Sequence, residues 1–200
     1  MTARSVPYPP PGCRIRVPEA LWAAALEEVR HYATLRAGPE RSRSEGLVYL
    51  AGVAIADELI VTSVLRLHHA PQGDRVQPTL AEVRWLLSTL RDRDEKLIAQ
   101  LHTHRHGAAH SSGDDRMATS FHEGFLSIVA PKFARGIHRI DQCVVHEYRN
   151  GSFQPLSYAE SVTRFRVHAQ IVDRHTVASE GPTRWRRFVK RLKSIARRRR

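Results

Sequence analysis

The stretch that decides the fold is Leu97 to Asp115, LIAQLHTHRHGAAHSSGDD, where an apolar run ends in a cluster of histidine and acidic residues. The pattern of Lys96 to Leu101 predicts a short buried strand. His102 and His104 then lie at its end on the same side, because alternate side chains of a strand share a face. The Ser-Gly-Asp-Asp sequence that follows predicts a helix start, with Ser112 at the N-cap.

The predicted helix start supplies a third candidate ligand. Asp114 and Asp115 fall in its first turn, and Asp115 is expected to turn back toward the two histidines. Two neutral imidazoles and one carboxylate are the protein ligands typical of catalytic zinc, which leaves a fourth position for water. The residues therefore predict a single Zn²⁺ per chain, bound by His102, His104 and Asp115. Asp114 is expected to be a first-turn residue favoured by the helix dipole.

The loop between the strand and the helix contains two further histidines, His106 and His110. Either could compete for the metal, but neither has the phasing of a strand or a helix that would aim it at the site. The sequence therefore does not select them as ligands.

The spacing of these residues, H-x-H-x7-S-x-x-D from His102 to Asp115, resembles the signature of the JAMM (MPN+) zinc metalloprotease family. That family also has an upstream glutamate before a glycine-bearing apolar strand, and Glu45 precedes such a run at Gly46 to Gly52. One departure is Arg105, which stands where the family usually has proline. Since proline is not a ligand, we expect an altered loop and not a lost site.

The resemblance implies catalytic roles for two residues. Glu45 would deprotonate the attacking water and later protonate the leaving amine. Ser112 would donate a hydrogen bond to the oxyanion of the tetrahedral intermediate. The simpler interpretations are a solvated carboxylate for Glu45 and a plain helix N-cap for Ser112.

The charge of the chain is unevenly distributed. The net charge is +12, and the segment from Pro182 to Arg200 contributes ten lysine and arginine residues without an acidic one, so the rest of the chain has a net charge of about +2. The chain has only two cysteines, Cys13 and Cys143, which lie far apart and match no metal-binding spacing. A disulfide framework is therefore not expected. No apolar run of 18 residues and no secretory signal are visible, so a cytoplasmic location is expected.

Local patterns predict the remaining elements. The expected helices are Pro18 to Leu35, the segment after Thr79 with Val83, Leu86, Leu87 and Leu90 on one face, Ser112 to Phe121, and Tyr158 to Phe165. The expected strands are Leu47 to Val53 and Glu58 to Leu67, joined at Ala56 and Asp57, then Phe125 to Ala130, Ile140 to Tyr148 and Ser152 to Leu156. Asn150-Gly151 is a strong signal for a two-residue hairpin turn.

These elements predict an α/β layered fold with helices against a curved mixed sheet. The resemblance implies, more narrowly, the MPN (cytidine-deaminase-like) fold. We expect three segments: an irregular proline-rich arm over residues 1–17, a metalloprotease domain over 18–175, and a basic amphipathic tail over 176–200.

The resemblance implies a zinc-dependent isopeptidase or peptidase that cleaves after the C-terminal glycine of a ubiquitin-like protein, in a bacterial conjugation pathway. Partners would be that protein or its conjugates, and the activating and conjugating enzymes of the same pathway. Arg105 and the loop His68 to Val76 are candidate contacts for the substrate. Two alternatives remain open: a JAMM-like protein with a DNA-associated or nucleic-acid-binding function, and a non-catalytic MPN scaffold.

The tail has an apolar stripe and a cationic face if it is helical. The apolar residues recur at spacings of three and four: Trp185, Phe188, Val189, Leu192, Ile195 and Ala196. This pattern suits an acidic partner, an anionic membrane surface or nucleic acid. The alternative is a helix that docks its stripe on the enzyme's own core.

Overall fold

The computed structural model describes residues 12–37, 42–67, 76–110, 112–120, 122–169 and 176–179. Most of the predicted arm and the basic amphipathic stripe of the tail lie outside these residues, as does the loop 68–75. None of the described helices combines the length and the apolar character that a membrane-spanning helix needs.

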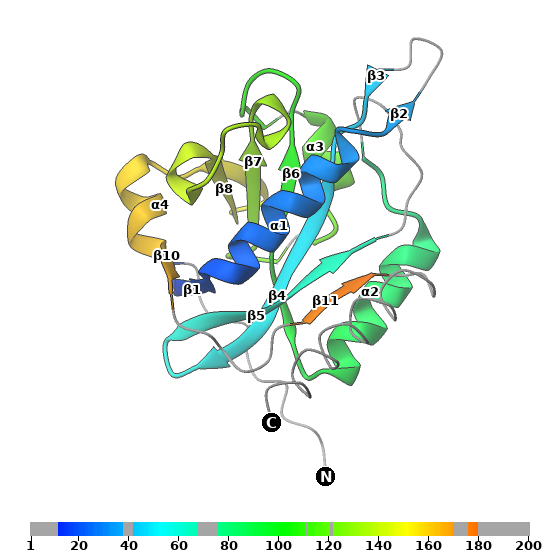
Figure 1. The fold of residues 1–200 in the computed structure, drawn as a ribbon. Coiled ribbons are helices and arrows are strands. Elements are labelled where there is room, and N and C mark those ends of the chain that lie inside the picture. Colours follow the sequence, from blue (N-terminus) through cyan, green and yellow to red (C-terminus); the bar gives the residue numbers. More distant parts are fainter. Residues whose placement is uncertain are drawn as a thin grey trace, which may run out of the picture.

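Helices and strands are interspersed along the chain (Figure 1). The helices are α1 Glu19–Tyr32, α2 Leu80–Asp92, α3 Ser112–Met117 and α4 Tyr158–Arg164. The strands are β1 Arg14–Pro18, β2 Arg36–Ala37, β3 Ser42–Arg43, β4 Leu47–Ile55, β5 Glu58–Arg66, β6 Lys96–Thr103, β7 Leu126–Ala130, β8 Val144–Arg149, β9 Ser152–Pro155, β10 Phe165–His168 and β11 Thr176–Ser179. Short 3-10 turns lie at Lys132–Ala134 and Ile140–Gln142.

Nine of the described strands form one mixed sheet in the order β10-β1-β5-β4-β6-β7-β8-β9, with β11 paired to β5. The centre is antiparallel, because β4 runs against both β5 and β6. Parallel pairs join β6 to β7, and β1 to both β5 and β10. This arrangement confirms the predicted α/β class with a mixed sheet and flanking helices.

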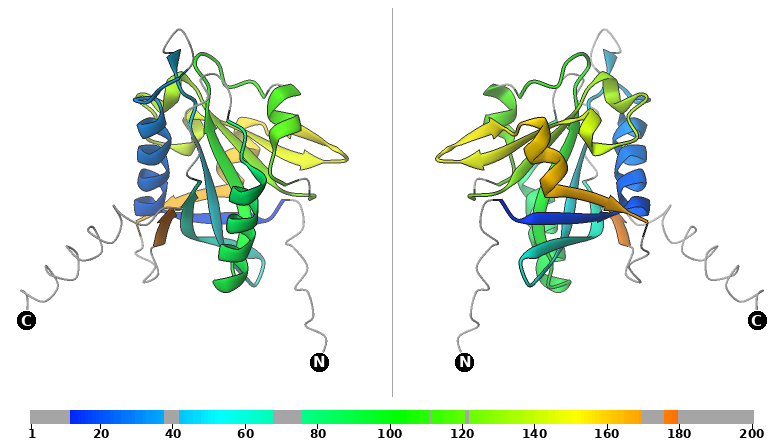
Figure 2. Two further views of the ribbon diagram at one scale, coloured as in Figure 1. Left: turned by 90° about the vertical axis from the view of Figure 1, so that its right-hand side faces the viewer. Right: turned by 90° about the vertical axis from the view of Figure 1, so that its left-hand side faces the viewer.

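The two faces of the sheet have separate cores. In Figure 2, α1 lies on one side of the sheet, and α2 and α3 lie on the other. Strand β4 contributes to both cores, since Val48 and Leu50 pack on the α1 side while Tyr49 and Ala51 pack on the α2 side. This double burial explains why the β4 sequence is apolar throughout and does not alternate.

Several local predictions are confirmed. The hairpin β4–β5 turns at Ala56, whose φ is 53°, and Asn150 and Gly151 turn between β8 and β9 with φ values of 50° and 85°. Thr79 and Glu82 form the expected capping box at the start of α2. On that helix, however, Leu87 was expected on the buried face and is 57% exposed.

Other boundaries differ from the prediction. Residues 14–18, assigned mostly to the arm, form β1 within the sheet, and β8 begins at Val144 and not at Ile140. Helix α3 ends at Met117, before Phe121. Helix α4 ends at Arg164, where Phe165 begins a strand that was not expected. The two unexpected strands, β1 and β10, arise from pairing between distant segments, which local patterns do not encode.

Gly46 determines how closely α1 approaches the start of β4. A Cβ atom at this position would lie 2.6 Å from the carbonyl oxygen of Val29 and 3.1 Å from the Cβ of Tyr32. Only glycine therefore permits this contact between the helix and the strand. The residue just before it is Glu45, so the same close packing fixes the backbone next to the predicted base.

A buried ion pair connects helix α4 to the sheet, and breaking it is a test of stability. Glu147 is fully buried and pairs with both Arg164 and Arg149, while Arg164 Nε also donates to the carbonyl of Cys13 at 3.1 Å. We expect Arg164→Met to lower the free energy of unfolding by about 3 kcal/mol, because a buried carboxylate loses a partner. Urea denaturation should detect this loss. The matched change at exposed Arg166 should alter stability by less than about 0.5 kcal/mol, and equal effects at the two sites would contradict the expectation.

Candidate metal centre

The histidine pair lies at the end of β6, near the middle of the sheet. Gln100, His102 and His104 lie at alternate positions along β6 and just beyond its end. Their side chains point to the face of the sheet that α2 and α3 cover. His102 pairs with Leu47 of β4 on one side and with Val129 of β7 on the other. Because both neighbouring strands hold its backbone, the direction of the His102 side chain is set by the sheet.

The backbone of His104 is held just beyond the strand. Its N–H donates to the carbonyl of Ala130 at 3.0 Å, and its carbonyl accepts from the N–H of Phe133 at 2.9 Å. The turn that supplies Phe133 has three consecutive residues, Lys132 to Ala134, with φ between 55° and 57°. Left-handed backbone at non-glycine residues is costly. It persists here in the turn that fixes the second histidine.

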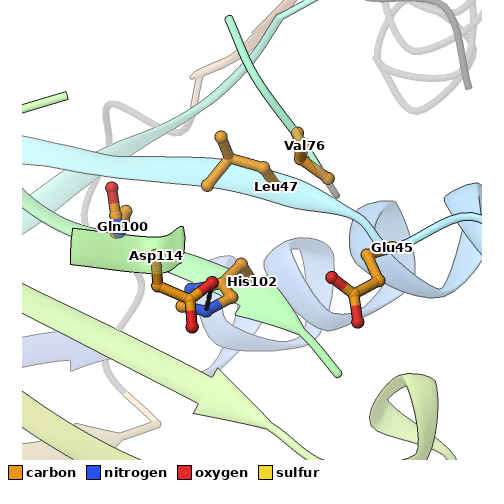
Figure 3. Close-up of a pocket in the computed structure, with 6 residues that line it drawn as sticks. All are labelled: Glu45, Leu47, Val76, Gln100, His102 and Asp114. Atoms are coloured by element: carbon orange, nitrogen blue, oxygen red, sulfur yellow. Dashed lines mark ion pairs between the residues drawn. The ribbon is translucent and has the colours of Figure 1, made fainter. Parts of the chain in front are cut away.

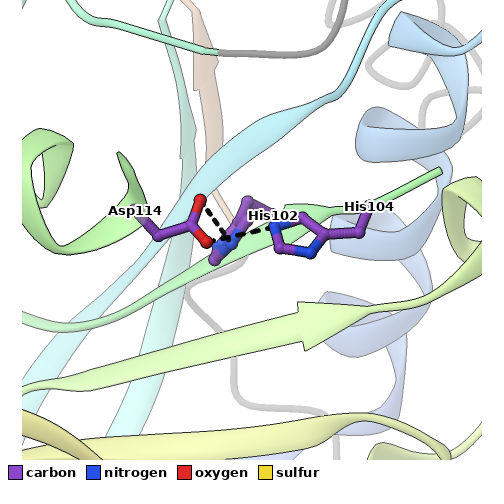
Figure 4. A group of neighbouring side chains, drawn as sticks. All are labelled: His102, His104 and Asp114. Atoms are coloured by element: carbon purple, nitrogen blue, oxygen red, sulfur yellow. Dashed lines mark ion pairs between the residues drawn. The ribbon is translucent and has the colours of Figure 1, made fainter. Parts of the chain in front are cut away.

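Asp114 of α3 completes the group (Figure 4). One carboxylate oxygen, Oδ1, lies 3.5 Å from His102 Nε2, and Oδ2 lies 3.3 Å from His104 Nε2. The candidate ligand atoms of the three residues are all within 4.8 Å of one another. The predicted pair of histidines therefore meets a carboxylate, as expected.

That carboxylate belongs to Asp114, not to Asp115, which corrects the predicted third position. Ser112 is the first residue of α3 and not the residue before it, so the helix begins one position earlier than predicted. Each residue of a helix turns by about 100°, so two adjacent aspartates cannot face the same side. Asp115 points elsewhere, is half exposed, and accepts a hydrogen bond from His110 Nδ1 at 2.8 Å.

The chemistry of the group fits zinc. Two imidazole nitrogens and a carboxylate are ligand types that zinc binds, and the candidate ligand atoms lie within 4.8 Å of one another. His102 is 6% exposed, and its Nε2 faces the Asp114 carboxylate at 3.5 Å, longer than a normal hydrogen bond. A cation bound at Nε2 and the carboxylate would satisfy both groups.

The protonation of the two histidines differs. Burial lowers the pKa of His102, against the effect of the Asp114 carboxylate. For His104, burial also lowers the pKa, but Asp114 and Glu45 together outweigh it and leave the pKa raised. A neutral ring is the form that binds a metal, and the burial of His102 favours that form.

Glu45 faces the same pocket (Figure 3). The pocket is lined by Glu45, Leu47, Val76, Gln100, His102 and Asp114. The residue after Glu45 is joined to the residue between the histidines by two hydrogen bonds: Gly46 N–H donates to Thr103 Oγ1 at 2.8 Å, and Thr103 N–H donates to the Gly46 carbonyl at 3.0 Å. This connection brings the predicted base, from far upstream in the sequence, to the predicted metal ligands.

Further polar residues, which the sequence analysis did not assign to the site, lie next to the three candidate ligands. Ser127 of β7 is fully buried and contacts both Gln100 and His110, and the ring of His146 lies 4.8 Å from that of His110. Burial, with the nearby His110 and His102, lowers the pKa of His146 to about 4. Loop residues without periodic spacing, such as His110, leave no local signal from which these contacts could be predicted.

Other predicted residues are placed only in part. The side chain of Ser112 lies outside the described part of the chain, so its oxyanion role stays a prediction. Arg105 is exposed directly after His104. Of the predicted substrate loop, Val76 is described, and it lines the pocket.

The comparisons with known proteins bear on the fold. The solution structure of protein DSY2949 from Desulfitobacterium hafniense is similar, with a TM-score of 0.51 and 14% sequence identity over 83% of this chain and 94% of that one. No family model and no curated protein sequence matches the chain. At this level of identity, the structural likeness shows a shared α/β fold alone.

Proposed function

We propose that this protein is a zinc-dependent peptidase or isopeptidase of the JAMM (MPN+) type, with an MPN-type fold, that cleaves after the C-terminal glycine of a ubiquitin-like protein. One observation carries the proposal: the Nε2 atoms of His102 and His104 converge with the Asp114 carboxylate in a pocket that Glu45 also lines. The order of these residues in the chain supports the same class, through the resemblance of the motif.

The three converging side chains would hold the metal. Bound zinc supplies Lewis acidity, which lowers the pKa of water toward about 7 and polarises a carbonyl. Asp114 lies at the start of α3, where the helix dipole favours its charged form. Its side chain is 12% exposed and lies close to both rings, where it would counter the positive charge of the ion.

Glu45 is the proposed general base. Its carboxylate lies on the pocket and outside the group of three, so it is not one of the proposed metal ligands. It would accept a proton from the attacking water and deliver it to the nitrogen of the leaving amine. The hydrogen bonds between Gly46 and Thr103 hold the backbone next to Glu45 at a set position relative to the histidines.

A serine would donate to the oxyanion. Counted back from Asp115, the S-x-x-D pattern begins at Ser112, as the resemblance implies. Counted back from Asp114, the same pattern begins at Ser111. The placement of Asp114 in the group therefore makes Ser111 the matching candidate, and Ser111→Ala and Ser112→Ala are the variants that separate the two.

The pocket wall suggests where the substrate enters. Leu47 and Val76 form its apolar side, opposite the polar groups. An extended tail lying along this wall would present its scissile carbonyl to Glu45 and the histidines. Arg105, exposed next to His104, is a candidate contact for acidic groups of the substrate.

The proposal is tested by zinc content and cleavage together. The purified protein is expected to contain about one zinc per chain and to cleave a fusion of ubiquitin to a fluorescent reporter. Treatment with a chelator should abolish cleavage, and added zinc should restore it. A protein that holds no zinc would overturn the metal assignment. A protein that holds zinc, yet cleaves neither this fusion nor one made with a bacterial ubiquitin-like protein ending in glycine, would overturn the proposed reaction.

A further inference from the structure

His110, a histidine outside the metal group, joins three elements around it. Its Nδ1 lies 2.8 Å from Asp115 Oδ1 on α3, and its Nε2 lies 3.1 Å from Ser127 Oγ on β7. Its side chain is only 5% exposed, and its ring lies 4.8 Å from the rings of His146 and Phe153. The loop between His104 and α3 is therefore fastened to the sheet at this residue.

The hydrogen bonds around His110 form a chain with one consistent direction. The Gln100 amide donates to Ser127 Oγ at 3.0 Å, which leaves the serine hydroxyl to donate to His110 Nε2. The Nδ1–H of His110 then donates to Asp115. Because each group has one donor or acceptor role at each contact, this series of hydrogen bonds fixes both the His110 ring and the Asp115 carboxylate.

The set of Asp115, His110 and Ser127 has the order of a hydrolytic triad, but its surroundings exclude that function. Ser127 is fully buried within β7 and already accepts a hydrogen bond from Gln100. A nucleophile has to reach the carbonyl of a substrate, and this hydroxyl does not. The arrangement instead orients α3.

The orientation of α3 determines which aspartate faces the histidines. Asp114 and Asp115 are adjacent, and about 100° of helix rotation separates their side chains. With Asp115 held by His110, Asp114 turns toward His102 and His104. Without that hold, rotation of this six-residue helix would bring Asp115 toward the site instead.

We infer that His110 is a positioning residue, which acts through Asp115 to fix the rotation of α3 and so selects Asp114 as the metal ligand. This inference rests on the proposed zinc site. It assigns to a loop histidine a role that the spacing of the motif does not contain.

Zinc affinity of the full chain, measured by competition with a fluorescent chelator, tests the inference. His110→Ala should weaken zinc binding, by up to the roughly 100-fold that loss of a direct outer-shell partner causes, because the released helix α3 no longer holds Asp114 toward the histidines. His110→Asn, whose amide N–H replaces the Nδ1 donor, should recover most of the affinity. The control is His106→Ala, an exposed histidine of the same loop, which should bind zinc as the parent does. Thermal unfolding confirms that each variant is folded.

A double-mutant cycle gives the sharper readout. Asp114→Ala should cost more than about 100-fold in zinc affinity in the parent, but less in the His110→Ala background, because the freed Asp115 takes its place. The visible absorption of the Co²⁺ form should change in His110→Ala and return in His110→Asn. If His110 only stabilised the loop, its replacement would change neither the cost of Asp114→Ala nor the Co²⁺ absorption.

The outcomes separate this inference from the proposed function. If the parent binds zinc and His110→Ala matches His106→Ala, His110 does not position the ligand, although the zinc site stands. If Asp115→Ala abolishes zinc binding and Asp114→Ala does not, the rotation is opposite to the one inferred. A parent without zinc would instead remove the proposed function on which the inference rests.

Discussion

Glu45→Gln is expected to keep its fold and its zinc but to lower kcat for cleavage of the ubiquitin fusion by about 10²- to 10⁴-fold, the range typical of a lost general base. Zinc is retained because Glu45 lies outside the group of His102, His104 and Asp114. The fold should be retained because glutamine has nearly the same shape as glutamate, and the adjacent backbone is held by the hydrogen bonds between Gly46 and Thr103.

The measurement for Glu45→Gln combines steady-state kinetics with metal analysis on the same preparation. Glu27→Gln is the matched control, since Glu27 is an exposed glutamate of α1 on the far face of the sheet. Cleavage by Glu45→Gln at the parent rate would exclude Glu45 as the base. Loss of zinc together with activity would show instead that Glu45 acts through the metal site.

His104→Ala is expected to lose the zinc and, with it, the activity. Removal of one of three protein ligands should weaken binding by more than about 100-fold, beyond the effect of an outer-shell change. The variant should still fold, because the two hydrogen bonds that hold this position, to Ala130 and from Phe133, involve its backbone alone. Elemental analysis after dialysis against chelator-treated buffer measures the retained zinc.

The comparison for His104→Ala is His106→Ala, two residues further along the chain and exposed. The two substitutions remove the same side chain from the same segment, so a difference in zinc content reports ligation and not the number of histidines. Equal zinc in both variants would rule out His104 as a ligand.

Local patterns predicted the elements that local chemistry specifies. The capping box of Thr79 and Glu82, the Asn150-Gly151 turn and the hairpin β4–β5 depend on residues close together in the chain, and all three are present. Strands β1 and β10 were missed, because their parallel pairing joins Ile15 to Phe165 across most of the sequence. No periodicity within either segment reveals that partner.

The structure brings His102 and His104 together and places Glu45 on the adjoining pocket, and the grouping differs from the expected one at the carboxylate. Strand alternation sufficed to place His102 and His104 together, and Glu45 was reached through the resemblance. The aspartate beside the histidines is Asp114 and not the expected Asp115, because the rotation of a short helix depends on tertiary contacts that the local pattern does not contain. Spacing along the chain identifies which residue types meet, and the packing of a loop decides which of two neighbours does.

The paired hydrogen bonds between Gly46 and Thr103 tie the proposed activity to the alignment of two strands. They belong to the alignment of β4 on β6, in which Leu47 faces His102. A slip of one residue in that alignment would turn the side chains of the slipped strand to the opposite face of the sheet. The base and the histidines would then no longer share a pocket, although nearly all the strand pairing could re-form. A sheet with the shifted alignment would have almost the same secondary structure as the correct one. Only the correctly aligned sheet would be active, so the proposed activity reports the strand alignment.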